Sequence, residues 1–143
     1  MNQRIKLLSI NQNFIDKIYQ HSLDEFPNEC CGILAGKNNN VSNIYLVKNT
    51  AKSPYRYLMD SKDLLDADKD TRDKNIDFIA FYHSHTHSKA YPSDTDVRMA
   101  LESGWTDIIY FLISLEDKEN PVLKIYSISE SGNISEEKLK ITK

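Results

Sequence analysis

The chain has 143 residues, of which 40% are hydrophobic and 27% are charged, and it contains only four Gly and four Pro. This length predicts one domain over 1–143, and the low Gly and Pro content excludes collagen-like and low-complexity chains. The net charge of −3 lacks the clustered excess of Lys and Arg that marks a nucleic-acid-binding surface. No apolar run approaches the ~20 residues that span a bilayer, and the N-terminal part shows no secretory segment. We therefore expect a soluble, cytoplasmic protein that binds neither nucleic acid nor membranes.

The first half of the chain predicts strands and one amphipathic helix. An apolar run over 5–10 indicates a first strand, and apolar residues at helical spacing indicate a helix over 12–25. Two further apolar runs, 31–35 and 41–47, lie on either side of an Asn-rich turn and predict a hairpin. Residues 55–59 predict one more strand.

A polar helix is predicted to follow over about 60–73. Asp60 or Ser61 is a suitable N-terminal cap, and Leu64, Leu65 and also Ala67 are candidates to face inward. Most of the other side chains in this segment are charged, so this helix is expected to be largely exposed.

The second half of the chain is expected to continue the mixture of helix and strand. Residues 76–85 predict a buried strand that ends in histidines, and 93–103 predict a helix that ends at Gly104. The remaining apolar segments predict strands over 108–115, 122–128 and 134–141. Together these elements predict an α+β class, in which helices flank an α/β-type mixed sheet.

The two cysteines, Cys30 and Cys31, are adjacent, so they cannot form a disulfide framework and are expected to be reduced thiols. Cys31 is interpreted as a small buried hydrophobic residue, and Cys30 is expected to point the opposite way and to be partly exposed. His21 is predicted on the solvent side of the first helix, and His87 in an exposed loop. The aromatic residues at 55–57 and Trp105 are interpreted most simply as packing residues, and the sequence does not distinguish this from Tyr57 or Trp105 lining a groove.

Most of the residues suited to catalysis lie in the segment HSHTHSKAYPSDTD, which spans 83–96. His83 and His85 are two residues apart, so on a strand both imidazoles leave the same face. Two imidazoles on a rigid element are good zinc ligands, and Asp96 at the start of the next helix is a candidate third ligand. Three protein ligands leave a fourth position for water, which is the arrangement of a catalytic zinc site.

The same residues also allow a purely structural interpretation. Ser93 and Asp96 have the spacing of an N-terminal capping box, in which the serine caps the helix and the aspartate lies near its dipole. Each of these patterns taken alone is ambiguous. Their occurrence within one short segment favours the metal site.

This combination resembles the signature of the JAMM (MPN-plus) metallopeptidases. The signature is His83-x-His85, seven intervening residues, and then Ser93-x-x-Asp96. Upstream, Glu29 precedes a Cys-Gly strand, an order similar to that of compact prokaryotic members. The resemblance covers essentially the whole chain, and it implies an MPN/JAB1-like domain with a cytidine-deaminase-like architecture.

The resemblance also implies a role for each of these residues. His83, His85 and Asp96 would bind one Zn²⁺ per chain. Glu29 would be the general base that deprotonates the zinc-bound water and then protonates the leaving amine. Ser93 would hydrogen-bond the oxyanion of the tetrahedral intermediate.

The implied function is that of a zinc-dependent peptidase or isopeptidase, similar to deubiquitinases. The expected partner is a ubiquitin-like or sulfur-carrier protein whose C-terminal Gly-Gly tail precedes the amide bond that is hydrolysed. Such a tail can add to the sheet as an extra strand.

Two alternative functions belong to other classes of protein. A catalytically silent MPN-type scaffold that binds protein partners would be expected to lack one or more ligands, and this sequence keeps all of them. A zinc deaminase would need H-x-E and P-C-x-x-C patterns, and both are absent.

Overall fold

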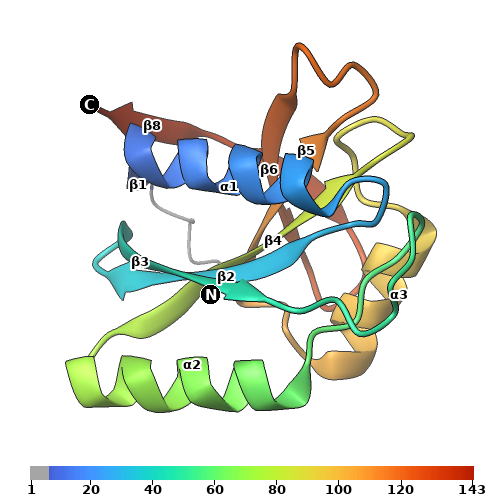
Figure 1. Cartoon of the computed structure of the whole chain (residues 1–143). Coiled ribbons are helices and arrows are strands. Elements are labelled where there is room, and N and C mark those ends of the chain that lie inside the picture. Colours follow the sequence, from blue (N-terminus) through green and yellow to red (C-terminus); the bar gives the residue numbers. More distant parts are fainter. Residues whose placement is uncertain (1–6) are drawn as a thin grey trace.

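The computed structural model describes residues 7–143, in which three helices pack against one mixed sheet (Figure 1). In chain order the elements are β1 (Leu8–Asn11), α1 (Gln12–Glu25), β2 (Cys31–Lys37), β3 (Asn40–Val47), α2 (Ser61–Lys74), β4 (Asp77–His85), α3 (Asp94–Ser103), β5 (Ile109–Ser114), β6 (Val122–Ile128), β7 (Ile134–Glu137) and β8 (Leu139–Thr142). Both parallel and antiparallel pairs occur, so the predicted α+β class is confirmed. Within the described part of the chain, no helix has the length and apolar character needed to cross a membrane.

The strand order is β7-β6-β5-β4-β2-β3-β1-β8, which places β4 and β2 in the middle of the sheet. β4 pairs antiparallel with β2 on one side and parallel with β5 on the other. Its second half, from Ala80 to His85, is buried throughout. The histidines at the end of β4 therefore sit on a central strand that is paired on both sides.

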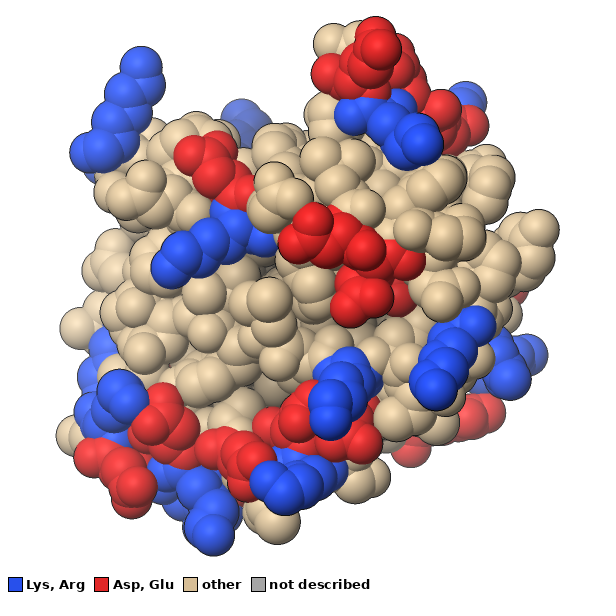
Figure 2. Space-filling model, in the orientation of Figure 1, with Lys and Arg blue, Asp and Glu red and all other residues tan. Residues whose placement is uncertain are grey.

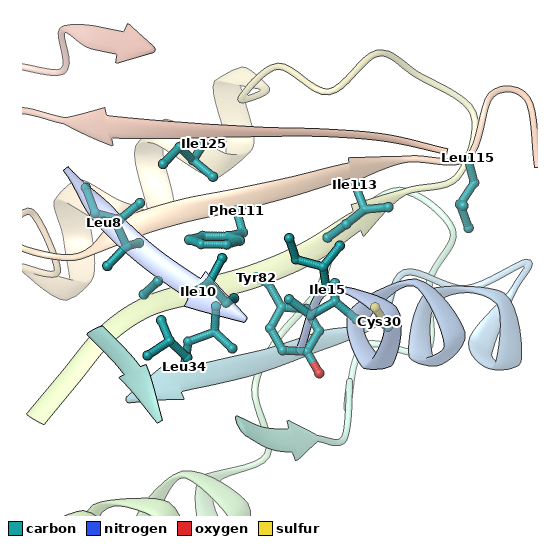
Figure 3. Close-up of a cluster of buried hydrophobic side chains, with 14 residues drawn as sticks. Leu8, Ile10, Ile15, Cys30, Leu34, Tyr82, Phe111, Ile113, Leu115 and Ile125 are labelled. Carbon is teal, nitrogen blue, oxygen red and sulfur yellow. The ribbon is translucent and has the colours of Figure 1, made fainter. Parts of the chain in front are cut away.

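Alternate residues of β4 supply two separate hydrophobic cores. Ala80 and Tyr82 face α1, and they belong to the cluster drawn in Figure 3 together with Phe111 and Ile113 of β5. Phe81 faces the opposite way, into a second cluster that includes side chains of α2 and α3. His83, two residues after Phe81, therefore points to the α2 and α3 face.

The helix boundaries follow from their capping residues. α1 spans the predicted 12–25, and the Asn11 side chain caps it by accepting from the backbone of Asn13. α2 is capped by Asp60, one of the two predicted caps. α3 ends at Gly104, which has the left-handed conformation (φ 77°) that glycine adopts at helix ends.

α2 carries three ion pairs at i,i+4 spacing, Lys62–Asp66, Arg72–Asp68 and Lys74–Asp70. Figure 2 accordingly shows basic and acidic side chains next to one another along the lower edge of the molecule. The predicted inward position of Leu65 is wrong, because this side chain is 55% exposed and Ala67 is the buried residue.

The predicted strand over 55–59 is wrong. Residues 48–60 form an irregular connection from β3 to α2, which we call the 48–60 loop, and its only strand-like feature is an isolated bridge between Asn49 and Met59. The apolar residues of this segment have different environments instead of sharing one face of a strand. Tyr57 is buried, while Tyr55 and Leu58 are exposed.

The predicted strand over 134–141 is two strands that lie on opposite edges of the sheet. β7 pairs with β6, and β8 pairs in parallel with β1, although only Lys138 separates them. Because consecutive Cα atoms are about 3.8 Å apart, the two edges must approach each other at this point. The sheet is therefore strongly curved.

Three other predictions are corrected or fall outside the described residues. His21 is buried, and its Nδ1 lies 2.7 Å from the Tyr82 hydroxyl, so it does not face solvent. Cys30 is only 1% exposed, because it precedes β2 on the side that packs against Ile15 and Ile18 of α1. The first two residues of the strand predicted over 5–10 lie outside the described residues, and the rest of that prediction corresponds to β1.

Candidate active site

The candidate site lies at the C-terminal end of β4, on the face shared with α2 and α3. His83 and His85 point to the same side, as their spacing predicted, and their Nε2 atoms are 3.2 Å apart. Both imidazoles are buried. The parallel strand β5 runs alongside and pairs Leu112 with His83, which keeps this strand end extended.

The first turn of α3 brings Asp96 to the two histidines. Its Oδ2 atom lies 2.9 Å from Nε2 of His85 and 3.1 Å from Nε2 of His83. The same oxygen accepts from the backbone N–H of Ser93, and the Ser93 hydroxyl accepts from the backbone N–H of Asp96. The capping box is therefore present, and it orients the carboxylate toward the imidazoles.

The three ligand atoms fit a zinc ion. Nitrogen and oxygen ligands lie about 2.0–2.2 Å from zinc, so tetrahedral geometry separates two such ligands by roughly 3.3 Å. The three separations of 2.9, 3.1 and 3.2 Å are close to this value. Imidazole and carboxylate groups are also the donor types found in catalytic zinc sites with three protein ligands.

The loop between β4 and α3 fixes the ring orientation of His85. Its Nδ1–H donates to the carbonyl of Lys89 at 2.7 Å, which leaves Nε2 free to bind a metal. Two hydroxyl groups hold this loop, since Ser114 donates to the Ser88 carbonyl and Tyr126 donates to the Ala90 carbonyl. These hydrogen bonds hold the loop that orients His85, the proposed metal ligand.

His83 is supported by stacking rather than by a hydrogen bond. Among the described residues its buried Nδ1 has no hydrogen-bond partner. The ring of Tyr57 stacks on the imidazole with centroids 4.4 Å apart and planes at 28°. Tyr57 belongs to the 48–60 loop, so this loop forms one wall of the site.

The charges of the three groups are strongly coupled. Burial acts to raise the pKa of Asp96, but His83 and His85 hold that pKa well below its usual range. Burial lowers the pKa of His83 despite the nearby carboxylate. For His85 burial acts in the same direction, but the hydrogen bond to Asp96 raises its pKa above the usual value. A deprotonated carboxylate beside a neutral imidazole is a suitable ligand set for a cation.

Glu29 lies immediately before β2, whose first residue pairs with His83 on the neighbouring strand β4. The carboxyl is 4% exposed, and its Oε1 atom is buried with no hydrogen-bond partner among the described residues. Burial raises the pKa of Glu29 to about 8, while His85 lowers it and Asp96 raises it. A carboxyl group with such a pKa is suited to accept and return a proton near neutral pH.

Ser93 is exposed, unlike the three ligand candidates. Its hydroxyl oxygen accepts one hydrogen bond from the backbone of Asp96, at 3.0 Å. Among residues 7–143 the hydroxyl hydrogen has no acceptor, so it is available to donate to a bound molecule.

The remaining His and Cys residues lie outside the ligand cluster. His87 is exposed, as predicted, and its ring lies near those of Phe26 and Tyr55. Cys30 and Cys31 are both buried free thiols, and burial raises the pKa of Cys30 to about 11. A thiol with this pKa is a poor nucleophile at neutral pH.

Sequence patterns did not identify the contributions of the 48–60 loop. Tyr57 and Trp105, for which both packing and lining a groove were open, line an apolar pocket of about 160 Å³ together with Met99. The stacking of Tyr57 on His83 was not predicted. Asn49, whose side chain contacts the backbone of Glu29, carried no motif at all. These roles depend on an irregular backbone path that residue spacing does not predict.

Comparison with known proteins agrees with this geometry. Residues 11–128 match the family described as prokaryotic homologs of the JAB domain. The chain belongs to this family. Its relatives include the CysO-cysteine peptidase of Mycobacterium tuberculosis, which is 31% identical over 96% of this chain and 92% of that protein. The desampylase of Pyrococcus furiosus is 29% identical over 78% of this chain and 74% of that protein.

A solved structure supports the fold of this JAB-domain protein. The solution structure of a protein from Desulfitobacterium hafniense superposes with a TM-score of 0.83 at 29% identity, covering 96% of this chain and 94% of that one. The JAMM resemblance of the sequence is thus confirmed at the level of family and fold.

Proposed function

We propose that this protein is a zinc-dependent peptidase or isopeptidase that hydrolyses the amide bond after the C-terminal tail of a ubiquitin-like or sulfur-carrier protein. One observation carries the proposal: two imidazoles and a carboxylate converge at the end of β4, within 3.2 Å of one another, beside the buried carboxyl of Glu29. Relatives named CysO-cysteine peptidase and desampylase support this substrate class.

We assign His83, His85 and Asp96 as the ligands of one zinc ion. When bound, zinc supplies a Lewis acid that makes water nucleophilic at neutral pH and polarises the scissile carbonyl. The paired strand β4, the hydrogen bond of His85 to the Lys89 carbonyl and the capping box of Asp96 restrict the orientation of the ligand side chains, which favours metal binding.

We assign Glu29 as the general base and acid. Its carboxylate takes a proton from the attacking water, whose oxygen bonds to the carbonyl carbon, and then gives that proton to the nitrogen of the leaving amine as the C–N bond breaks. The Ser93 hydroxyl, with its hydrogen free to donate, stabilises the negative charge that develops on the carbonyl oxygen.

A catalytically silent scaffold remains the alternative from another class. It is less consistent with the buried Oε1 atom of Glu29, which has no hydrogen-bond partner among the described residues. Burying such a group costs stability, and proteins tolerate this cost mainly at functional sites. We also propose that 1–143 is one domain, because its described strands form a single sheet. A cytoplasmic location is proposed because both buried cysteines are free thiols.

Intact-mass spectrometry tests the proposed reaction. A Gly-Gly-tailed sulfur carrier extended by one cysteine would be incubated with the zinc-loaded protein, with the Glu29→Gln variant as the matched control. We expect the wild type alone to remove one cysteine mass. Zinc binding without cleavage would redirect the search to ubiquitin-like conjugates or short peptides, and failure to bind zinc would favour the scaffold.

A further inference from the structure

The 48–60 loop has almost no regular backbone pairing, yet it contacts the candidate site at several points. Three backbone hydrogen bonds join residues of this loop in the described structure. Those from the N–H of Thr50 to the Leu58 carbonyl and from the N–H of Asp60 to the Lys48 carbonyl form the bridge between Asn49 and Met59, and the third runs from the N–H of Lys52 to the Asn49 carbonyl. Side-chain hydrogen bonds therefore contribute much of what holds its conformation.

The side chain of Asn49 makes most of these bonds. Its Nδ2 donates to the carbonyl of Glu29 at 3.0 Å and to the carbonyl of Arg56 at 3.1 Å. Its Oδ1 accepts from the backbone N–H of Ala51 at 3.0 Å and from that of Leu58 at 2.9 Å. An asparagine amide has two donor hydrogens and two acceptor lone pairs, so all four are used.

The backbone of Glu29 is bonded to this loop on both sides of the residue. Its carbonyl accepts from Asn49, and its N–H donates to the carbonyl of Ser53 at 2.9 Å. Glu29 lies outside β2, so no strand pairing fixes it, and these two bonds take that place. The direction of its carboxyl therefore depends on the loop.

The same loop also supports the histidine strand. Tyr57 stacks on His83, and the Thr86 hydroxyl, one residue after His85, donates to the carbonyl of Pro54 at 2.8 Å. One loop thus holds both the proposed base and the proposed ligands, and the Asn49 amide closes that loop on itself.

We propose that Asn49 is a positioning residue for Glu29. Its amide holds the backbone of the general base and, through Arg56 and Leu58, the loop that lies against the ligands. This inference rests on the proposed function for its catalytic consequence, but the structural part of it is testable without any substrate.

Two substitutions distinguish positioning from general support of the loop. Asn49→Asp keeps the side-chain shape and the Oδ1 acceptor, but it replaces the donor by an oxygen that repels the carbonyls of Glu29 and Arg56. Thr50→Val is the matched control, because Thr50 donates to the Leu58 carbonyl within the same loop and does not reach Glu29. Asn49→Ala serves as a second variant if Asn49→Asp does not fold, as judged by circular dichroism.

Amide hydrogen exchange, followed by NMR, gives the direct test. The Glu29 N–H is bonded to the Ser53 carbonyl, so its exchange reports how often the loop that Asn49 closes opens away from Glu29. In Asn49→Asp we expect this N–H to exchange at least about tenfold faster, because the closed loop loses a stabilisation of about one hydrogen bond. In Thr50→Val we expect Glu29 to keep its protection. Unchanged protection of Glu29 in Asn49→Asp overturns the proposal, whether or not the protein cleaves any substrate.

Kinetics then tests the catalytic consequence. With the cysteine-extended carrier, we expect Asn49→Asp to lower kcat by about 100-fold with KM and zinc content unchanged, and Thr50→Val to stay within about twofold of wild type. Faster Glu29 exchange with an unchanged kcat overturns the positioning role. If the wild type does not cleave the carrier, the proposed substrate fails, and the exchange result alone decides the role of Asn49.

Discussion

Helices α2 and α3 begin with the same local pattern, a capping residue followed three positions later by an aspartate. In α2 the side chain of Asp60 accepts from the backbone N–H of Asp63. In α3 the side chain of Ser93 accepts from the backbone N–H of Asp96. The two helices also end alike, each at a residue in the left-handed conformation.

The two aspartates differ in what their carboxylates meet. That of Asp63 is partly exposed and accepts from the backbone N–H of Lys48 at 2.9 Å. That of Asp96 is 8% exposed and meets the Nε2 atoms of His83 and His85. The N–H of the capping residue Ser93 holds the Asp96 carboxylate, whereas the Asp63 carboxylate is held by Lys48, fifteen residues away. The histidines of the neighbouring strand β4 make Asp96 the candidate ligand.

Removing each aspartate gives the strongest test of this difference. We expect Asp96→Ala to lower zinc affinity by more than about 100-fold and to abolish turnover, because a direct ligand is lost. We expect Asp63→Ala to keep one zinc per chain. Zinc content after dialysis, measured by inductively coupled plasma mass spectrometry, and calorimetric titration check both. Equal zinc loss in the two variants would mean that the whole fold, and not the ligand, had been affected.

Glu29 is as buried as Asp96 but does not belong to the ligand cluster. Replacing it therefore tests whether loss of a buried carboxylate that is not a ligand leaves zinc binding intact. We expect Glu29→Gln to bind zinc as wild type does and to lower kcat by about 10²–10⁴-fold, the range for loss of a general base. The measurement is turnover of the carrier substrate alongside zinc content. Full turnover in this variant would contradict the assignment of the base.

The two caps provide a smaller and more discriminating test. We expect Ser93→Ala and Asp60→Ala each to cost about 1 kcal/mol of unfolding free energy, because each removes an N-cap acceptor. Only Ser93→Ala is expected to lower kcat as well, by about 100-fold, through loss of the oxyanion donor. Urea unfolding and steady-state kinetics measure the two effects. If the variants behaved identically in both assays, Ser93 would be a cap alone.

The C-terminal caps are expected to show the smallest effects, and on stability alone. Asn75 ends α2 at φ 56°, so Asn75→Gly should raise the unfolding free energy by less than about 1 kcal/mol. Gly104→Ala should lower the unfolding free energy by about 1 kcal/mol, because alanine is strained at the positive φ of this position. A steric clash adds nothing to this cost, since a Cβ here meets no atom within 4 Å. Turnover should not change in either variant, and denaturant titration measures the shifts.

The elements predicted correctly from the sequence are those with strong local signals. α1 coincides with the predicted 12–25, and the hairpin of β2 and β3 lies where the Asn-rich turn indicated. The 55–59 segment failed, although its residues alternate as a strand would, because the Asn49 side chain takes the backbone groups that a partner strand would otherwise need. The burial of His21 was not predicted either, since its partner Tyr82 is distant in the sequence.

The sequence by itself determined the spacing of His83, His85, Ser93 and Asp96, and with it the family. Alternation along a strand and capping at a helix start are local rules, so they act wherever the segment folds. Only the tertiary structure decided that the two motifs meet, that Glu29 is buried beside them, and that the 48–60 loop holds them. It also separated β7 from β8 onto opposite edges of a curved sheet. These outcomes depend on contacts between residues far apart in the chain, which local residue patterns do not specify.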